Sequence, residues 1–264
     1  MSGIVSSCCA MVHAMEELRT YREAARNRGV PEPVIDWWLK LARRQAGLHK
    51  HGGGPVVGHF GGNPSLPADV EWPVDHHCGK DEPIPFVASI DCGALPPGAL
   101  DIAVPEDGCL LFFTDYDDFN AGDSRVIYVA EGTPTAERAA LYPEDTYGRF
   151  PLHYVPHWKL PEDEAVPLSS FAPDSLFHQH HLGGLGWEVG CRLDTGEMTL
   201  GGYVTKVQDD PRRDESWVLL AETSVGEDTF GEPRGFAIIH WIIPQEDLAE
   251  KRFDRVEAVK AQVH

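Results

Sequence analysis

The sequence contains no uninterrupted apolar run that approaches the roughly 18 residues of a membrane-spanning helix. Basic residues are also scarce, since 22 Lys and Arg stand against 42 Asp and Glu and give a formal net charge of −20. A protein field of this sign repels phosphate backbones and anionic membrane surfaces. The composition therefore predicts neither a nucleic-acid partner nor a membrane partner.

Disulfide and secretion signals are weak. The chain has 6 cysteines in 264 residues, and none of them forms a C-x-x-C pair, so a disulfide scaffold is not indicated. The first residues, Met1 to Ala14, lack a basic region, and their apolar stretch is interrupted by Ser6 and Ser7. We therefore expect no signal peptide and predict a cytoplasmic protein in a reducing compartment.

Familiar catalytic and cofactor motifs are missing as well. The run His51–Gly54 is similar to a lipase oxyanion-hole motif, but the chain has no G-x-S-x-G nucleophile elbow. Neither a phosphate-binding P-loop nor a G-x-G-x-x-G between strand and helix is present. The acidic run Asp115–Asp123 has Phe119 and Val126 where a calcium-binding EF-hand needs ligands. The sequence thus indicates no cofactor.

The expected fold begins with two helices. Met15–Arg28 has an apolar face and is followed by Gly29, and Val34–Ala46 has another apolar face and is followed by Gly47. The rest of the chain shows β-branched and aromatic bias, with hydrophobic residues at 42% of the whole sequence. The strands that we expect are Pro85–Ile90, Gly108–Thr114, Arg125–Ala130, Leu185–Leu193, Trp217–Glu222 and Gly235–Ile243.

The remaining segments are irregular or short. Thr133–Asp174 is rich in proline and acids, and we interpret it as a long connection with a short helix over Pro134–Ala140. A short helix should run from Pro244 through Arg252. Phe253–Val263 is predicted as a closing strand or, alternatively, as a helix.

Two parts of the sequence follow the same order. Phe60–Gly62, Pro85–Asp91 and Gly108–Phe113 form an apolar-Gly-Gly, strand and Gly-led strand series. Leu200–Gly202 begins a second series, which continues through 216–222 and 235–240. The pattern predicts an internal duplication in which two units pack as a pseudo-symmetric pair.

These residues carry a family resemblance over about residues 48–263. Phe60–Pro67 followed by Glu71–Pro73 resembles the opening of the YwqG-like family, a bacterial domain of unknown function. Later motifs are similar to that family in the same order: Phe86–Asp91, Gly108–Phe113, Gly201–Tyr203 with Gln208–Asp210, Gly235–Phe236, Ile242–Ile243 and Asp247–Leu248.

The resemblance implies an α+β fold of internally duplicated, mixed and mainly antiparallel β-sheets with N-terminal helices packed against them. We predict a helical extension over residues 1–47 and a duplicated domain over 48–264, with halves at about 48–132 and 185–264. The family implies no established reaction. Relatives near bacterial toxin systems make an immunity-like, partner-binding role conceivable.

Histidines provide the alternative hypothesis. His76 lies in a His-His-Cys run, and His178 and His180 lie in a second dense run. In a strand, His178 and His180 would point to one face and could supply two ligands of a zinc site. A metal-assisted hydrolase is therefore the alternative function, although adjacent histidines in such loops are commonly only exposed.

The leading hypothesis is a non-enzymatic binding protein with a basic protein partner, motivated by the net charge of −20. Trp72, in a proline-rich loop, is a candidate ligand contact, and the alternative is that it packs at the edge of the core. The acidic candidates for the contact surface are Asp115, Asp117, Asp118 and Asp209.

Overall fold

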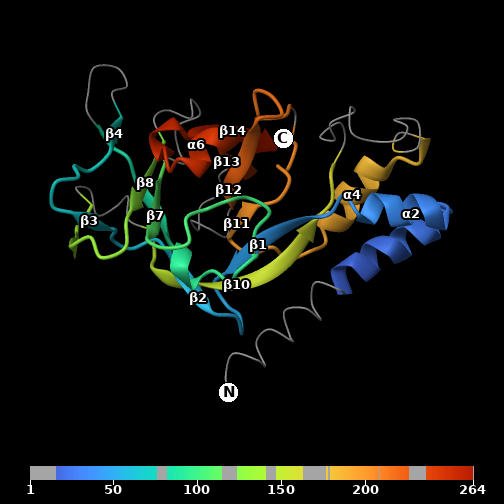
Figure 1. Cartoon of the computed structure of the whole chain (residues 1–264), viewed down its shortest axis with the longest axis horizontal. Coiled ribbons are helices and arrows are strands. Elements are labelled where there is room, and N and C mark those ends of the chain that lie inside the picture. The colour runs from blue at the N-terminus through green and yellow to red at the C-terminus, as the bar shows by residue number, and fades with distance from the viewer. Residues whose placement is uncertain are drawn as a thin grey trace.

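The computed structural model describes residues 16–75, 82–114, 124–140, 147–162, 177, 179–207, 209–225 and 236–263. Ten strands form one sheet in the order β14-β13-β12-β11-β1-β10-β2-β6-β7-β8, and every pair of neighbours is antiparallel. The chain is therefore an α+β protein dominated by one large antiparallel sheet (Figure 1).

The strands of this sheet are β1 (Arg43–His49), β2 (Val56–Phe60), β6 (Phe86–Asp91), β7 (Cys109–Phe113), β8 (Arg125–Val129), β10 (Phe150–Lys159), β11 (Met198–Gly201), β12 (Trp217–Val225), β13 (Phe236–Pro244) and β14 (Glu257–Val263). Two separate two-stranded sheets are formed by β3 (Ser65–Pro67) with β9 (Thr135–Glu137), and by β4 (Val74–Asp75) with β5 (Glu82–Pro83).

The helices form a minor layer. Residues 16–27 are helical, and α2 (Glu32–Leu39) and α4 (Leu182–Gly190) join them beside the central strands β1 and β10 (Figure 1). Their apolar faces share a core of buried side chains that includes Tyr21, Trp38 and Leu185. Shorter elements are η2 (Cys92–Ala94), α6 (Gln245–Ala249) and η5 (Phe253–Arg255). Among the described residues, none of the helices combines the length and apolarity required to cross a bilayer.

The sheet curls on itself around its main core. Phe112 of β7 and Trp241 of β13 are far apart in strand order, yet their buried rings meet edge to face with centroids 5.2 Å apart. Near the two sheet edges, Tyr128 of β8 lies 5.7 Å from Phe253 of η5, measured between ring centroids. The concave face, here called the inner face, holds the largest apolar cluster, and the opposite side is called the outer face.

On either side of β1 and β10 lie two sets of four strands: β2-β6-β7-β8, the first half-sheet, and β11-β12-β13-β14, the second half-sheet. The first strand of each ends in a Gly-Gly pair with positive φ, at Gly61–Gly62 and Gly201–Gly202. A register shift follows Phe86 in β6 and Leu219 in β12. These bends help each half-sheet to curve toward the other.

Several expected elements were wrong. The helix expected over Val34–Ala46 ends at Leu39, and its last residues belong to β1, whose alternate side chains reach the sheet core. The expected strand Leu185–Leu193 overlaps α4, because the buried residues Leu182, Leu185 and Val189 follow helical spacing against the other helices.

The connection Thr133–Asp174 was also misinterpreted, since it contains the central strand β10. Pro151 and Pro156 lie within β10, and such residues usually argue against a central strand because proline cannot donate a ladder hydrogen bond. The expected helix Pro134–Ala140 is the short strand β9. Phe253–Val263 ends in the strand β14, which is the first of the two alternatives for that segment.

Candidate functional site

A cleft of about 440 Å³ lies on the outer face of the central strands, beside α4 and helix 16–27. Its size suits a small ligand, because such sites usually measure about 300–1,000 Å³. The lining residues come from segments that are far apart in the sequence: Tyr21, Gln45, His157, Trp158, Lys159, Glu162, Trp187, Gly190, Cys191, Leu193, Thr195, Thr199, Thr205, Lys206, Val207, Glu222, Ser224 and Ile238.

Strand alternation places polar residues in the cleft floor. On β1, Ala46 and Leu48 face the inner core, so Gln45 points to the opposite side. On β11, Leu200 faces the same core, and its neighbour Thr199 points outward. The outer face of these strands therefore differs from an ordinary packed sheet face, because it is polar although its residues are buried.

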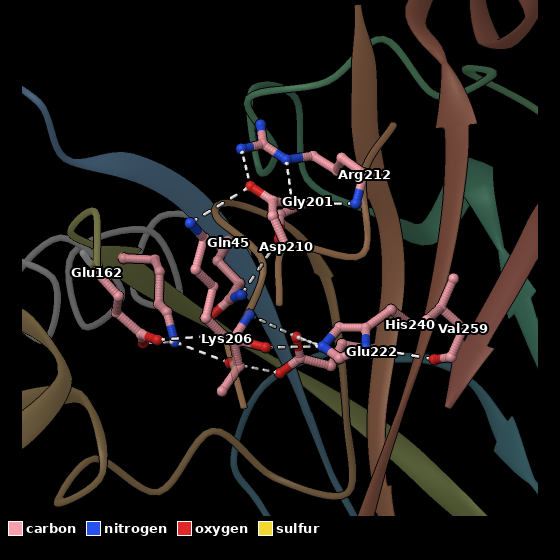
Figure 2. Close-up of polar contacts among 11 residues, drawn as sticks. Gln45, Glu162, Gly201, Lys206, Asp210, Arg212, Glu222, His240 and Val259 are labelled. Atoms are coloured by element: carbon pink, nitrogen blue, oxygen red, sulfur yellow. Dashed lines mark hydrogen bonds and ion pairs between the residues drawn. The ribbon is translucent and has the colours of Figure 1, made fainter. Parts of the chain in front are cut away.

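The cleft wall contains a connected polar network (Figure 2). The Lys159 ammonium lies 2.6 Å from the Glu162 carboxylate and donates to the Thr205 hydroxyl at 3.0 Å. Thr205 in turn donates to Glu222 through its hydroxyl at 2.7 Å and its backbone N–H at 2.9 Å. Because all of these side chains are buried or nearly so, the contacts exchange little with solvent.

His240 completes this network and carries a positive charge. Its Nε2 lies 2.9 Å from the carbonyl of Thr205 and 3.3 Å from the Glu222 carboxylate, and its Nδ1 lies 3.4 Å from the carbonyl of Val259. Both ring nitrogens thus face atoms that only accept, which requires both to be protonated. Burial alone lowers the pKa of His240, but the contact with Glu222 outweighs it and raises the pKa.

The pKa values of Glu222 and Lys159 also shift in the direction that favours their charged forms. Burial raises the pKa of Glu222, but the His240 hydrogen bond and charge, together with Lys159, hold that pKa at about 2. Burial likewise lowers the pKa of Lys159, and the carboxylates of Glu162 and Glu222 outweigh this and raise it. The ionic contacts thus favour the charged forms of Glu222, His240 and Lys159 against the effect of burial.

A second buried pair lies where helix 16–27 meets β10. The Glu17 carboxylate lies 2.5 Å from Nδ1 of His157 and accepts the backbone N–H of Trp158 at 2.8 Å. The ring of His157 covers Gly47, where an added Cβ would come within 2.4 Å of it. The glycine therefore allows the imidazole to lie flat against β1.

Some polar groups in the cleft have spare hydrogen-bonding capacity. The Thr199 hydroxyl is buried and has no hydrogen-bond partner within the described segments. Cys191 also lines the cleft, but burial and the nearby Glu162 raise the pKa of its thiol, so it is not an activated nucleophile. At the cleft rim, Trp187 is 51% exposed, which is unusual for such a large apolar side chain.

The two half-sheets differ at the positions that form this network. Counted from the Gly-Gly pair that ends the first strand, Ser89 of β6 occupies the register position of Glu222 in β12. By the same count, Leu111 of β7 occupies the position of His240 in β13. Leu111 is buried in an apolar cluster. The strand arrangement therefore forms without an ion pair at this position.

The candidate residues from the sequence lie elsewhere. Trp72 is partly buried, donates its indole N–H to the carbonyl of Ile84 at 3.0 Å and packs edge to face on Phe113. This position agrees with the interpretation that Trp72 packs at the edge of the core. A ligand contact of Trp72 stays a prediction. Asp209 is exposed, whereas Asp115, Asp117 and Asp118 lie outside the described residues.

The histidine cluster is only partly described. His180 is partly exposed at the start of the α4 region, and His76 and His178 lie outside the described residues. Within the segments that the structure describes, no group of three His, Cys, Asp or Glu side chains is placed to hold a metal ion. The metal hypothesis therefore stays a prediction.

Lys159, Glu222 and His240 were not among the site residues predicted from the sequence. A signal was present for two of them, because Glu222 directly follows the apolar run of one predicted strand and His240 interrupts that of another. A charged residue within a buried strand needs a partner, and this pattern can identify such a site.

Comparison with known proteins places the chain in one family. None of the curated proteins matches the sequence. The family described as "Domain of unknown function (DUF1963)" matches residues 58–259, which include the last three strands of the cleft and most of its network. The chain belongs to this DUF1963 family.

Proposed function

We propose that this protein is a non-enzymatic binding protein and that the cleft on the outer face of the sheet, beside α4, is its ligand site. The observation that carries the proposal is the Glu222–His240 ion pair, buried where the first half-sheet has Ser89 and Leu111. A buried ion pair contributes little net stability compared with apolar residues of similar volume. Its presence beside a cleft is therefore better explained by recognition than by folding.

The proposal includes the internal duplication, with halves at about 48–132 and 185–264, and membership of a YwqG-like group. Support comes from the equivalent strand orders and from the register shift that follows Phe86 and Leu219. Phe112 and Trp241 hold the same register position and contact each other across the core. A duplicated fold explains how one half became a binding site while the other remained apolar.

A cleft-filling variant tests the site. A Cβ at Gly190 would lie 3.6 Å from the Tyr21 hydroxyl and 4.0 Å from the Glu162 carboxylate, so Gly190→Leu should occupy the cleft. Gly184→Leu is the matched control, since it changes the same helix at a position with no atom within 4 Å.

Each protein is incubated with the small-molecule fraction of the cells in which it naturally occurs and examined by native mass spectrometry. The wild type and Gly184→Leu should retain a ligand that Gly190→Leu does not. Equal retention by all three proteins, or by none, contradicts the proposal.

A basic protein partner is the second candidate, favoured by the net charge of −20. A cytoplasmic location is part of this proposal. For a co-purified basic partner, the triple change Asp115→Asn, Asp117→Asn and Asp118→Asn should slow association and flatten its salt dependence. Unchanged rates would exclude Asp115, Asp117 and Asp118 as the contact residues.

A further inference from the structure

The two most deeply buried ion pairs in the cleft wall are already compensated within the protein. Lys159 pairs with Glu162 at 2.6 Å, and Glu222 pairs with His240 at 3.3 Å. Lys206, the other cation of the wall, lies 3.6 Å from Asp210, a carboxylate that Arg212 also binds at 2.8 Å. A charged ligand would thus bring an unpaired charge into a site that has no free counter-charge in these pairs. The wall favours a neutral ligand.

Two polar groups nevertheless remain available. An ammonium has three hydrogen-bond donors, and Lys159 directs two of them, to Glu162 and to the Thr205 hydroxyl. The third has no partner within the described part of the chain. Thr199 is 94% buried, since only 6% of its surface is exposed, and its hydroxyl is unpartnered among the described residues.

Both groups line the cleft, and both are connected with Glu222. Thr199 is its cross-strand neighbour in β11, and Lys159 reaches it through Thr205. A spare N–H donor and a hydroxyl can both donate to an oxygen acceptor. Leaving such groups buried without partners costs free energy, which a ligand that supplies an acceptor would recover.

Part of the cleft lining is apolar. Leu193, Val207 and Ile238 line it, and the indole of Trp187 stands half-exposed at its rim. An exposed indole beside an apolar wall suits a flat ring, because aromatic groups stack on such faces. The cleft volume of about 440 Å³ accommodates a ring with a small substituent.

From these observations we infer that the ligand is a small, neutral, planar carbonyl or amide compound. Its carbonyl oxygen accepts from Lys159 and Thr199, and its ring lies toward Trp187. This inference rests on the proposed function, because it assigns a chemical class to the ligand of the same cleft.

Three probes of nearly equal shape test the class: benzamide, benzoate and benzylammonium, which are neutral, anionic and cationic. Their dissociation constants are measured by NMR titration of the full chain. Benzamide should bind about 10-fold more tightly than either ion, because only the ions bring an unpaired charge. Equal or tighter binding of an ion overturns the inference.

The polar contact is tested with Thr199→Val, which should weaken benzamide binding about 5-fold, the effect of one hydrogen bond of roughly 1 kcal/mol. Thr199→Ser keeps the hydroxyl and should bind benzamide as tightly as the wild type does. This variant keeps the test informative if Thr199→Val folds poorly. Thr223→Val, on the other face of the neighbouring strand, should bind as the wild type does.

Gly190→Leu separates the two levels of the argument. If Gly190→Leu loses the natural ligand but the wild type does not prefer benzamide over the two ions, only the ligand class is overturned. Two results would overturn the assignment of the carbonyl to this cleft. The first is benzamide binding that is unchanged in Gly190→Leu, and the second is equal benzamide affinity of Thr199→Ser and Thr199→Val.

Discussion

Replacing Glu222 with glutamine removes one charge of the buried network while keeping the shape of the side chain. In the folded protein the pKa of Glu222 is held at about 2, compared with its ordinary value of 4.5, although burial works in the opposite direction. At about 1.4 kcal/mol for each tenfold change in proton affinity, this corresponds to about 3 kcal/mol of stability. The side chain is only 13% exposed, so solvent screens little of it.

The pH range of this contribution follows from the direction of the change. Because the pKa is lower in the folded state, the stability from Glu222 is complete above about pH 4.5 and is lost as the pH falls toward about 2. His240, whose pKa is raised, contributes below its ordinary value of 6.5 and loses that contribution as the pH rises through the folded value. Both contributions are present near pH 5.5.

Urea unfolding followed by tryptophan fluorescence measures the effect. Glu222→Gln should be about 3 kcal/mol less stable than the wild type at pH 5.5, and the difference should narrow to about half at pH 3. Glu131→Gln, at an exposed turn position, serves as the control and should change little at either pH. A difference for Glu222→Gln that is the same at both pH values would refute the argument, because it would not arise from the carboxylate charge.

Two further predictions concern neighbouring positions of the cleft floor. In urea melts, Thr199→Val should leave the free energy of unfolding unchanged or slightly raised, because the hydroxyl has no partner among the described residues. Thr223→Val should lower the free energy of unfolding by about 1 kcal/mol, because it removes a 2.7 Å hydrogen bond to a backbone carbonyl. The opposite order would show that Thr199 is hydrogen bonded. Gly47→Ala should cost about 1–3 kcal/mol by the same assay, since its Cβ would meet the ring of His157 at 2.4 Å, and Gly148→Ala, in open space, should cost far less. Equal effects of the two alanines would show that the imidazole does not cover Gly47.

Local patterns predicted the strands with clear β bias but not the centre of the sheet. The strands expected at Gly108–Thr114 and Arg125–Ala130 correspond to β7 and β8. In contrast, β10 contains two prolines, and β1 follows α2 after three residues, so neither has the sequence signature of a central strand. Their positions depend on pairing with distant segments, which a local pattern does not report.

The candidate site was harder to predict for a related reason. Lys159, Thr205, Glu222 and His240 are separated by up to 81 positions in the chain, and only the strand register brings them together. The dense histidine and aspartate runs gave a clear signal for candidate sites because their residues are adjacent in sequence. A buried network of single charges gives a weaker signal, although each charge in an apolar strand marks a position that needs a partner.

The central claim is that ligand binds in the cleft beside Trp187, and fluorine NMR of protein labelled with 5-fluorotryptophan tests it most directly. The chain has 7 tryptophans, and the signals of Trp187 and Trp72 can be assigned with Trp187→Phe and Trp72→Phe. On addition of the small-molecule fraction of the native cells, the signal of Trp187, half-exposed at the cleft rim, should move, while that of Trp72, packed on the other half-sheet, should not. A shift of Trp72 with Trp187 unmoved, or no shift of either signal, would contradict the claim.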